Sequence, residues 1–175
     1  GFGGVADLEK NKIGLVLAEA KLLKTEQEIL YEAIEAYTGL ILAKEKVDIN
    51  RRNVNLLERQ VETDQARLGK GKITIADLAQ SESSLAGAQA KFIEAKNEKI
   101  TAKLTYKKVI GPIADANSLS KNLNINFKIP SSLNKAIEIS KKNNAELVIA
   151  KLEYEQSEKD VAIAKSDLSP SAILS

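Results

Sequence analysis

The chain has 175 residues and a net charge of +2 at pH 7; 29% of its residues are charged and only 4% are aromatic. It has no Cys and no His, which excludes thiol and imidazole nucleophiles, His metal sites and Cys-based zinc sites. The interleaved Lys and Glu indicate a solvated surface and not a nucleic-acid-binding patch, so we expect no nucleic-acid partner, no metal and no cofactor.

Ala, Leu, Ile, Glu and Lys dominate the composition, which is typical of long helices. No apolar run reaches the roughly 18 residues that a membrane-spanning helix needs. Met is absent, even at position 1, so we expect the chain to be an excerpt from a longer protein. Residues 1–8 and 169–175 are interpreted as stubs of truncated strands at its two ends.

Residues 9–68 are predicted to form one uninterrupted helix of about 60 residues, roughly 90 Å long. Small and apolar residues recur there in alternating steps of three and four, the heptad pattern of a coiled coil, and we call such a row a seam. The first seam comprises Ala33, Ala36, Leu40, Ala43, Val47, Asn50, Val54, Leu57, Val61, Asp64 and Leu68. A second seam, in the first half only, comprises Ile13, Val16, Ala20, Leu23, Gln27, Leu30, Ile34, Tyr37 and Ile41. We therefore expect neighbours on two sides of the first half and one partner helix along the second half.

A glycine-bearing turn over residues 69–74 leads into a return helix over residues 75–110. The return helix has about 35 residues, roughly 53 Å, and matches only the half of the first helix nearer the turn. It ends at the strong breaker pair Gly111-Pro112. Its seam comprises Leu78, Ser81, Leu85, Ala88, Phe92, Ala95, Lys99, Ala102, Tyr106 and Val109.

Residues 111–144 have a mixed pattern: alternation over 123–129 indicates a short strand, and residues 130–132 cap a short helix. A final helix is predicted over residues 145–168. Its seam comprises Leu147, Ala150, Tyr154, Ser157, Val161, Ala164 and Leu168. Its length of roughly 36 Å, added to that of the return helix, nearly equals that of the first helix. The expected fold class is mainly all-α, a long antiparallel helical hairpin. The return helix and the final helix would together line the whole first helix end to end, with a small mixed belt at their junction.

With these motifs the chain resembles the periplasmic part of the TolC-type outer-membrane efflux proteins. Four segments, which together reach along essentially the whole chain, carry the resemblance by their order and spacing: Arg67-Leu68-x-x-Gly71 with Thr74-x-x-Asp77-Leu78-x-Gln80, Gly111 after Tyr106-Lys107-Lys108-Val109-Ile110, Pro130-Ser131-Ser132-Leu133-x-x-Ala136 with Asn143-Asn144-x-Glu146-Leu147, and Leu168-Ser169-Pro170-Ser171. The chain departs from the family at Ala145, where a proline is usual, and it carries one long hairpin where the family has two repeats. It thus looks like roughly half of such a protein without the membrane strands.

The resemblance implies a homotrimer whose strands form one β-barrel in the outer membrane of a Gram-negative-type envelope. Its helices would form a hollow α-barrel across the periplasm. The implied partners are a periplasmic adaptor protein and an inner-membrane transporter, which open the helical tips for multidrug efflux or type I secretion. The duct is passive, so no enzyme activity is implied. Residues 1–8 and 169–175 would lead into the membrane barrel, and residues 111–144 would be the equatorial segment.

The resemblance also singles out residues at the hairpin turn. Arg67, Leu68 and Gly71 match positions of the adaptor-docking surface, while Thr74 and Asp77 match the aperture and its gate. Local structure offers simpler roles: Gly71 permits a positive φ, Thr74 is a reasonable N-cap, and Asp77 suits the dipole of the return helix. Both interpretations remain open.

Two other classes of protein also carry a long helical hairpin. One is a periplasmic adaptor (membrane-fusion) protein, but such adaptors flank the hairpin with a lipoyl-like β domain, which is not seen here. The other is a structural coiled-coil scaffold, which needs neither the Thr-x-x-Asp motif nor a belt. Asn50 and Asp64, polar residues in the first seam, either set the register of the hairpin or face a water-filled lumen.

Overall fold

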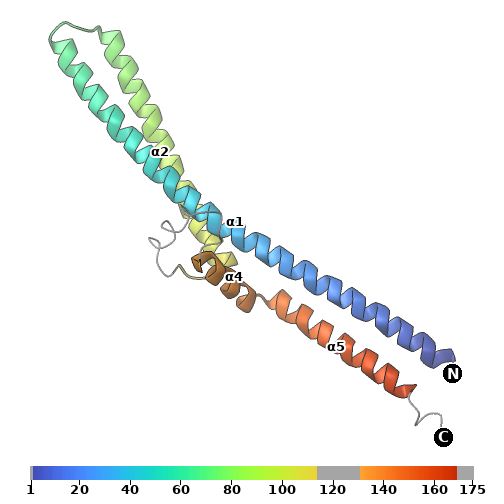
Figure 1. Cartoon of the computed structure of the whole chain (residues 1–175). Coiled ribbons are helices and arrows are strands. Elements are labelled where there is room, and N and C mark those ends of the chain that lie inside the picture. Colours follow the sequence, from blue (N-terminus) through green and yellow to red (C-terminus); the bar gives the residue numbers. More distant parts are fainter. Residues whose placement is uncertain (1, 114–130, 169–175) are drawn as a thin grey trace. The chain divides into compact units, whose positions relative to one another are not determined.

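The structure is a computed structural model that describes residues 2–113 and 131–168. Four helices make up nearly all of this part of the chain (Figure 1): α1 (Phe2–Gly69), α2 (Ile75–Val109), α4 (Ser131–Asn143) and α5 (Ala145–Asp167). No strand occurs among the described residues, so the expected fold class, mainly all-α, is confirmed.

The strand stub expected over residues 1–8 is wrong for residues 2–8, which form the first two turns of α1. Two glycines there cost only about 1 kcal/mol each in helix propensity. Gly4 lies against the side chain of Leu168, where an added Cβ would come within 2.8 Å of a methyl carbon. The helix is therefore extended by packing. The expected strand over 123–129 and the stub over 169–175 lie outside the described residues.

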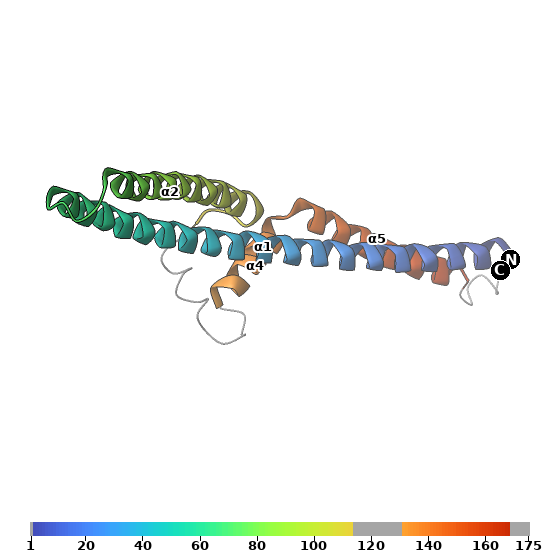
Figure 2. The same ribbon diagram turned by 90° about the horizontal axis from the view of Figure 1, so that it is seen from above.

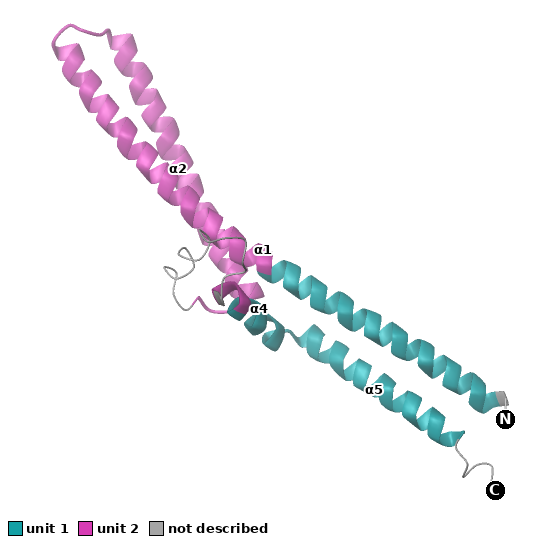
Figure 3. Ribbon diagram, in the orientation of Figure 1, with its two compact units in different colours: residues 1–33, 135–175 teal, residues 34–134 magenta. Residues whose placement is uncertain are grey.

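Two compact units divide the chain (Figure 3): unit 1 contains residues 1–33 and 135–175, and unit 2 contains residues 34–134. The long helix α1 contributes to both. In unit 2, α2 runs antiparallel along the second part of α1, and in unit 1, α5 runs antiparallel along the first part (Figures 1 and 2). Each unit is thus built on its own pair of antiparallel helices.

The core of unit 2 is the predicted seam of α1 against the predicted seam of α2. The buried apolar residues of these two rows in unit 2 are Ala36, Leu40, Ala43, Val47, Val54, Val61, Ala88, Ala95 and Tyr106. Many are alanine or valine, and small side chains let two helix axes approach closely. The heptad pattern therefore identified the contact between these helices correctly.

Tyr37 joins three helices of unit 2. Its side chain is fully buried, and its ring centroid lies 6.4 Å from that of Tyr106 in α2. Its hydroxyl is hydrogen-bonded to the Ser132 hydroxyl of α4, with 2.6 Å between the oxygens. Burial also raises the pKa of Tyr106. A tyrosine in such a position supplies a large apolar surface and satisfies its own hydroxyl.

In unit 1 the packed row of α1 extends the first predicted seam from Ala33 toward the N-terminus, over residues that the sequence interpretation did not include. Its buried or half-buried residues there are Leu8, Leu15, Ala18, Leu22 and Ile29. They meet the predicted seam of α5, in which Leu147, Ala150, Val161 and Ala164 are buried. The second predicted seam of α1, by contrast, leaves Ile13, Val16, Leu23 and Leu30 exposed within the described residues.

Leu40→Ala is expected to lower the free energy of unfolding by about 2–5 kcal/mol, because it removes a fully buried side chain from the seam. Leu42→Ala removes the same atoms from a side chain that is 61% exposed, and its effect is expected to stay within about 0.5 kcal/mol. Urea unfolding followed by circular dichroism, at a dilution at which the chain is monomeric, measures both. Equal losses for the two variants would contradict the packing described here.

Candidate functional site at the hairpin turn

The turn between α1 and α2 ends α1 with a complete Schellman motif. The amide of Lys72 donates to the carbonyl of Arg67 over 2.9 Å, and the amide of Gly71 donates to the carbonyl of Leu68, also over 2.9 Å. Gly71 has φ +70°, a left-handed conformation that glycine adopts without the cost that a Cβ imposes. The turn is therefore short and defined by its backbone hydrogen bonds.

A capping box then starts α2. The hydroxyl of Thr74 accepts a hydrogen bond from the amide of Asp77 over 3.2 Å, and the carboxylate of Asp77 accepts one from the amide of Thr74 over 2.9 Å. Each side chain satisfies a backbone donor that the helix itself leaves unpaired. Thr74 and Asp77 thus have complete local roles, while their role at an aperture stays a prediction.

All five residues singled out in the sequence come together at this turn and the helix ends that flank it. Arg67 is exposed in the last turn of α1, a position that the helix dipole favours for a cation, and Leu68 is half-buried at the end of the seam. The structure therefore places Arg67, Leu68 and Gly71 beside Thr74 and Asp77. The docking of an adaptor on them stays a prediction.

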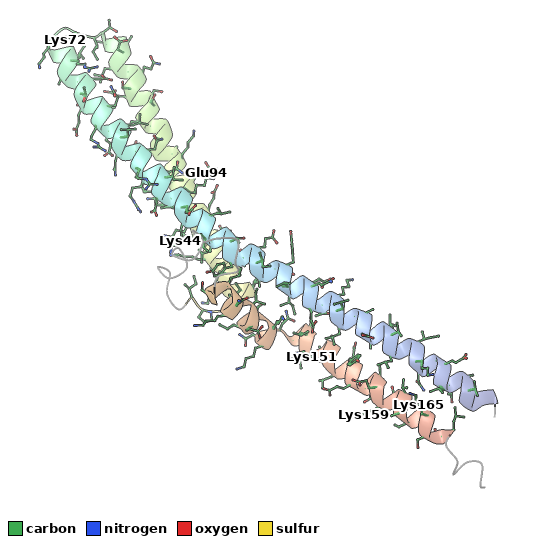
Figure 4. The ribbon with its side chains drawn as sticks, in the orientation of Figure 1. Lys44, Lys72, Glu94, Lys151, Lys159 and Lys165 are labelled. Carbon is green, nitrogen blue, oxygen red and sulfur yellow. The ribbon has the colours of Figure 1, made fainter. Side chains whose placement is uncertain are left out.

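The turn carries a concentration of positive charge. Lys70 and Lys72 are both exposed, and Figure 4 marks Lys72 at this end of the hairpin. Among the described residues, neither lysine nor Arg67 takes part in a salt bridge. Beside them the side chain of Ile75, the first residue of α2, is 76% exposed.

Asp64 lies between the two helices close to the turn. It is only 7% exposed, and its carboxylate accepts hydrogen bonds from the hydroxyl of Ser81 in α2 and from the side-chain amide of Gln60, the latter over 3.1 Å. The bond from Ser81, followed by the bond from Gln60, lowers the pKa of Asp64 below its ordinary value of 3.8. Of the two roles considered for Asp64, the structure favours setting the register of the hairpin.

Two exposed rows of residues on the hairpin were missed in the sequence. The first, which we call the outer seam, lies on the side of α2 turned away from α1 and proceeds in alternating steps of four and three. It comprises Ala79, Ser83, Ala86, Ala90, Ile93, Asn97, Ile100 and Leu104, all exposed and none charged. The second row, the outer stripe, comprises Leu42, Ile49 and Leu56 of α1, each more than half exposed.

These two rows lie at the same level of the hairpin. The ammonium of Lys46 is 2.8 Å from the carboxylate of Glu98, and the guanidinium of Arg51 lies 5.5 Å from the ring centroid of Phe92. Ile49, between these two contacts, is therefore level with the middle of the outer seam. Uncharged residues in heptad spacing are typical of a face that packs on another helix.

Other kinds of site find no support in the described residues. No group of His, Cys, Asp and Glu side chains there is arranged to hold a metal ion. None of the described helices combines the length and apolar character that crossing a membrane requires.

The comparisons with known proteins agree with one another. The family described as outer membrane efflux protein matches residues 2–112 of the chain. The chain is 25% identical over 155 residues to the alkaline protease secretion protein AprF of Pseudomonas aeruginosa. The matched region covers 83% of this chain and 32% of AprF. The chain is also 33% identical over 101 residues to the outer membrane efflux protein BepC of Brucella suis biovar 1. That matched region covers 57% of this chain and 22% of BepC. These matches thus cover a third or less of the relatives' length. No solved structure matches the chain significantly.

Gly71→Ala is expected to destabilise the hairpin by about 1–2 kcal/mol, because a Cβ is disfavoured in the left-handed conformation. Gly69→Ala is the matched control: Gly69 has helical geometry, and alanine there is expected to stabilise by about 0.5–1 kcal/mol. At both positions an added Cβ meets no atom within 4 Å, so the two effects are conformational. Thermal unfolding that shifts in the same direction for both variants would refute this account.

The contribution of Asp64 to stability is expected to depend on pH. Because the folded state lowers its pKa, the stabilisation is complete above the unfolded value and is lost as the pH falls through the folded value. The difference in unfolding free energy between the unmodified chain and Asp64→Asn should therefore shrink from about pH 5 downward. Urea unfolding at several pH values measures it, with the exposed Glu62→Gln as control. A difference that is constant down to pH 2 would exclude the carboxylate as its source.

Proposed function

We infer the function of the chain from one premise: it belongs to the outer membrane efflux protein family. We propose that it is the periplasmic α-barrel segment of a trimeric, TolC-like outer-membrane duct for efflux or secretion. In this proposal the duct is a passive conduit, and a periplasmic adaptor and an inner-membrane transporter open it at the helical tips. The family match disfavours the two rival classes, an adaptor hairpin and a coiled-coil scaffold.

The observation that carries the proposal is the pair of exposed rows on the hairpin. The outer seam of α2 and the outer stripe of α1 are level with each other and lie on the sides of the two helices that face away from the shared seam. A second hairpin in the same orientation brings its α1 against the α2 of the first. Head-to-tail contacts of this kind close into rings when the rotation between neighbours allows it. A ring of parallel hairpins is a hollow barrel.

Covering these rows is energetically favourable. Each exposed Leu or Ile that becomes buried contributes about 1.5–3 kcal/mol, against which the entropy of association must be set. The two rows hold six such residues: Leu42, Ile49, Leu56, Ile93, Ile100 and Leu104. The exposed apolar surface of these six residues therefore favours packing against helices of other chains.

Unit 1 supports the same proposal independently. The second predicted seam of α1 is exposed there, and a groove of about 510 Å³ runs between α1 and α5. Leu17, Ile149 and Leu152, each more than half exposed, line that groove. In a duct with two repeats per chain, helices of the other repeat and of neighbouring protomers would cover these faces.

The proposed gate is at the turns. There Arg67, Leu68 and Gly71 would form the docking surface for the adaptor, and a ring of Asp77 carboxylates, each carried by a Thr74 cap, would line the aperture. The carboxylate of Asp77 uses one hydrogen bond in the capping box and is otherwise exposed, so its charge is available to ions. Rings of carboxylates favour cations.

The full-length protein, purified in detergent, is expected to be a trimer that gives small, cation-preferring currents in a planar bilayer. Asp77→Ala is expected to increase the current, and Asp77→Asn, which keeps an acceptor for the cap, is expected to weaken the cation preference. Thr74→Ala removes the cap but keeps the charge, so it separates the loss of the helix start from the loss of the carboxylate. A monomer or dimer without conductance would rule out the duct, whereas a trimer indifferent to both Asp77 variants would exclude Asp77 from the gate.

The same experiment also tests whether the outer seam is an interface between protomers. Ile93→Glu places a charge in the middle of the outer seam and is expected to dissociate the trimer or abolish conductance. Lys91→Glu introduces the same side chain on the exposed surface of α2 outside that row, and the trimer is expected to persist. A trimer that tolerates Ile93→Glu would show that this row is not an interface.

A further inference from the structure

The surface of the hairpin turn combines two features that the hairpin does not need. Ile75 is the most exposed large apolar side chain among the described residues, at 76%. Three cations, Arg67, Lys70 and Lys72, lie within the same short stretch of chain and are all exposed. A partner with an apolar area and opposite charge would complement an exposed apolar side chain that is accompanied by several exposed cations.

Local structure does not account for Ile75. The cap of α2 is made by Thr74 and Asp77, and neither hydrogen bond of the capping box involves the Ile75 side chain. β-Branched residues are also poorer helix formers than Ala, Glu or Lys at a solvated position. The cost of exposing this side chain in the free hairpin is therefore not offset within the hairpin.

Local structure does not pair the two lysines with an acid either: among the described residues neither Lys70 nor Lys72 takes part in a salt bridge. Arg67 differs, because its charge acts on the buried carboxylate of Asp64, which also accepts from Ser81 and Gln60. The exposed carboxylate of Asp77, in the first turn of α2, accepts from the backbone of Thr74. The exposed carboxylates of Glu62 and Glu82 lie further back on the two helices. Arg67 gains from the dipole of α1, but Lys70 and Lys72 lie beyond the end of that helix.

The backbone between these cations is also open. A Cβ built on Gly69 or on Gly71 meets no heavy atom within 4 Å. A partner can therefore approach the backbone of the turn itself, between Arg67 and Lys72, and reach Ile75, the first residue of α2. The turn thus combines an accessible backbone at Gly69 and Gly71, an exposed apolar side chain at Ile75 and exposed cations at Lys70 and Lys72.

We propose that the partner which docks on this turn presents an apolar pocket for Ile75, with Asp or Glu side chains around the pocket that pair with Lys70 and Lys72. This inference rests on the proposed function, because it specifies the chemistry of the adaptor surface. An acidic protein surface fits better than an anionic membrane: lipid-binding clusters usually hold four to eight Lys or Arg, and here one aliphatic side chain and three cations are present.

The first experiment places a photo-crosslinking amino acid at position 75 of the full-length protein in cells. The expected product joins position 75 to a periplasmic adaptor, in a segment whose apolar residues are flanked by Asp or Glu. Crosslinks to lipid alone, or to an adaptor segment that lacks acidic residues, would overturn the inference.

The second experiment measures binding of that purified adaptor to the full-length protein. Ile75→Ser is expected to weaken binding roughly tenfold to a hundredfold. Lys70→Glu with Lys72→Glu is expected to weaken it by at least tenfold, and the remaining binding should no longer weaken as salt is added. The matched controls are Ile163→Ser and the pair Lys151→Glu with Lys159→Glu, and both are expected to bind like the unmodified protein. Ile163 is 60% exposed on α5. The two lysines, labelled in Figure 4, are exposed on the same helix.

The outcomes separate this inference from the proposed function. If the unmodified trimer conducts and binds the adaptor, but Ile75→Ser and the double lysine variant bind equally well, the inference is wrong and the duct stands. If the protein neither conducts nor binds an adaptor, the proposed function fails and the inference fails with it. The purified protein is also tested for binding to vesicles of phosphatidylglycerol and phosphatidylethanolamine. If it binds these vesicles and Ile75→Ser abolishes that binding, the partner of the turn is a membrane and the inference of an acidic protein partner is wrong.

Discussion

The close packing of small side chains along α1 is the constraint on which the described structure depends. A helix of 68 residues has no core of its own, and helices in water gain most of their stability from an apolar face packed on a partner. Alanine and valine in the seam let α2 approach α1 closely, whereas the part of α1 that packs on α5 also holds Leu8, Leu15, Leu22 and Ile29. One row of apolar residues thus serves two partner helices, and the turn lies where the first of these partners begins.

The turn is self-sufficient in its hydrogen bonds, and this changes how its residues are interpreted. The Schellman motif around Gly71 and the capping box of Thr74 and Asp77 satisfy the backbone at both helix ends. Residues with such complete local roles are weak evidence for function on their own. Ile75, Lys70 and Lys72 have no comparable local role, and they therefore say more about what the turn contacts.

Much of this arrangement is predictable from the sequence, because heptad spacing and turn chemistry are local signals. The seam from Ala36 to Leu68, the turn and the Thr74 cap were all identified in this way. The helix over residues 2–8 was not, because its glycines suggested a break and its contact with Leu168 is remote in sequence. The outer seam of α2 was missed because alanine and serine give a weak hydropathy signal. Asp64 was ambiguous because a polar seam residue has the same spacing whether it faces Ser81 or water.

The outer seam has one further property, a gradient of side-chain size. Its positions nearest the turn are Ala79, Ser83, Ala86 and Ala90, whereas Ile93, Ile100 and Leu104 follow further along α2. Helix axes approach to about 8 Å over the smallest side chains and stay nearer 10 Å over larger ones. The axis of a helix packed along this row therefore lies closer to the axis of α2 near the turn than at the other end of the row. Neighbouring hairpins would converge toward their turns because of side-chain volume alone, with no kink in either backbone.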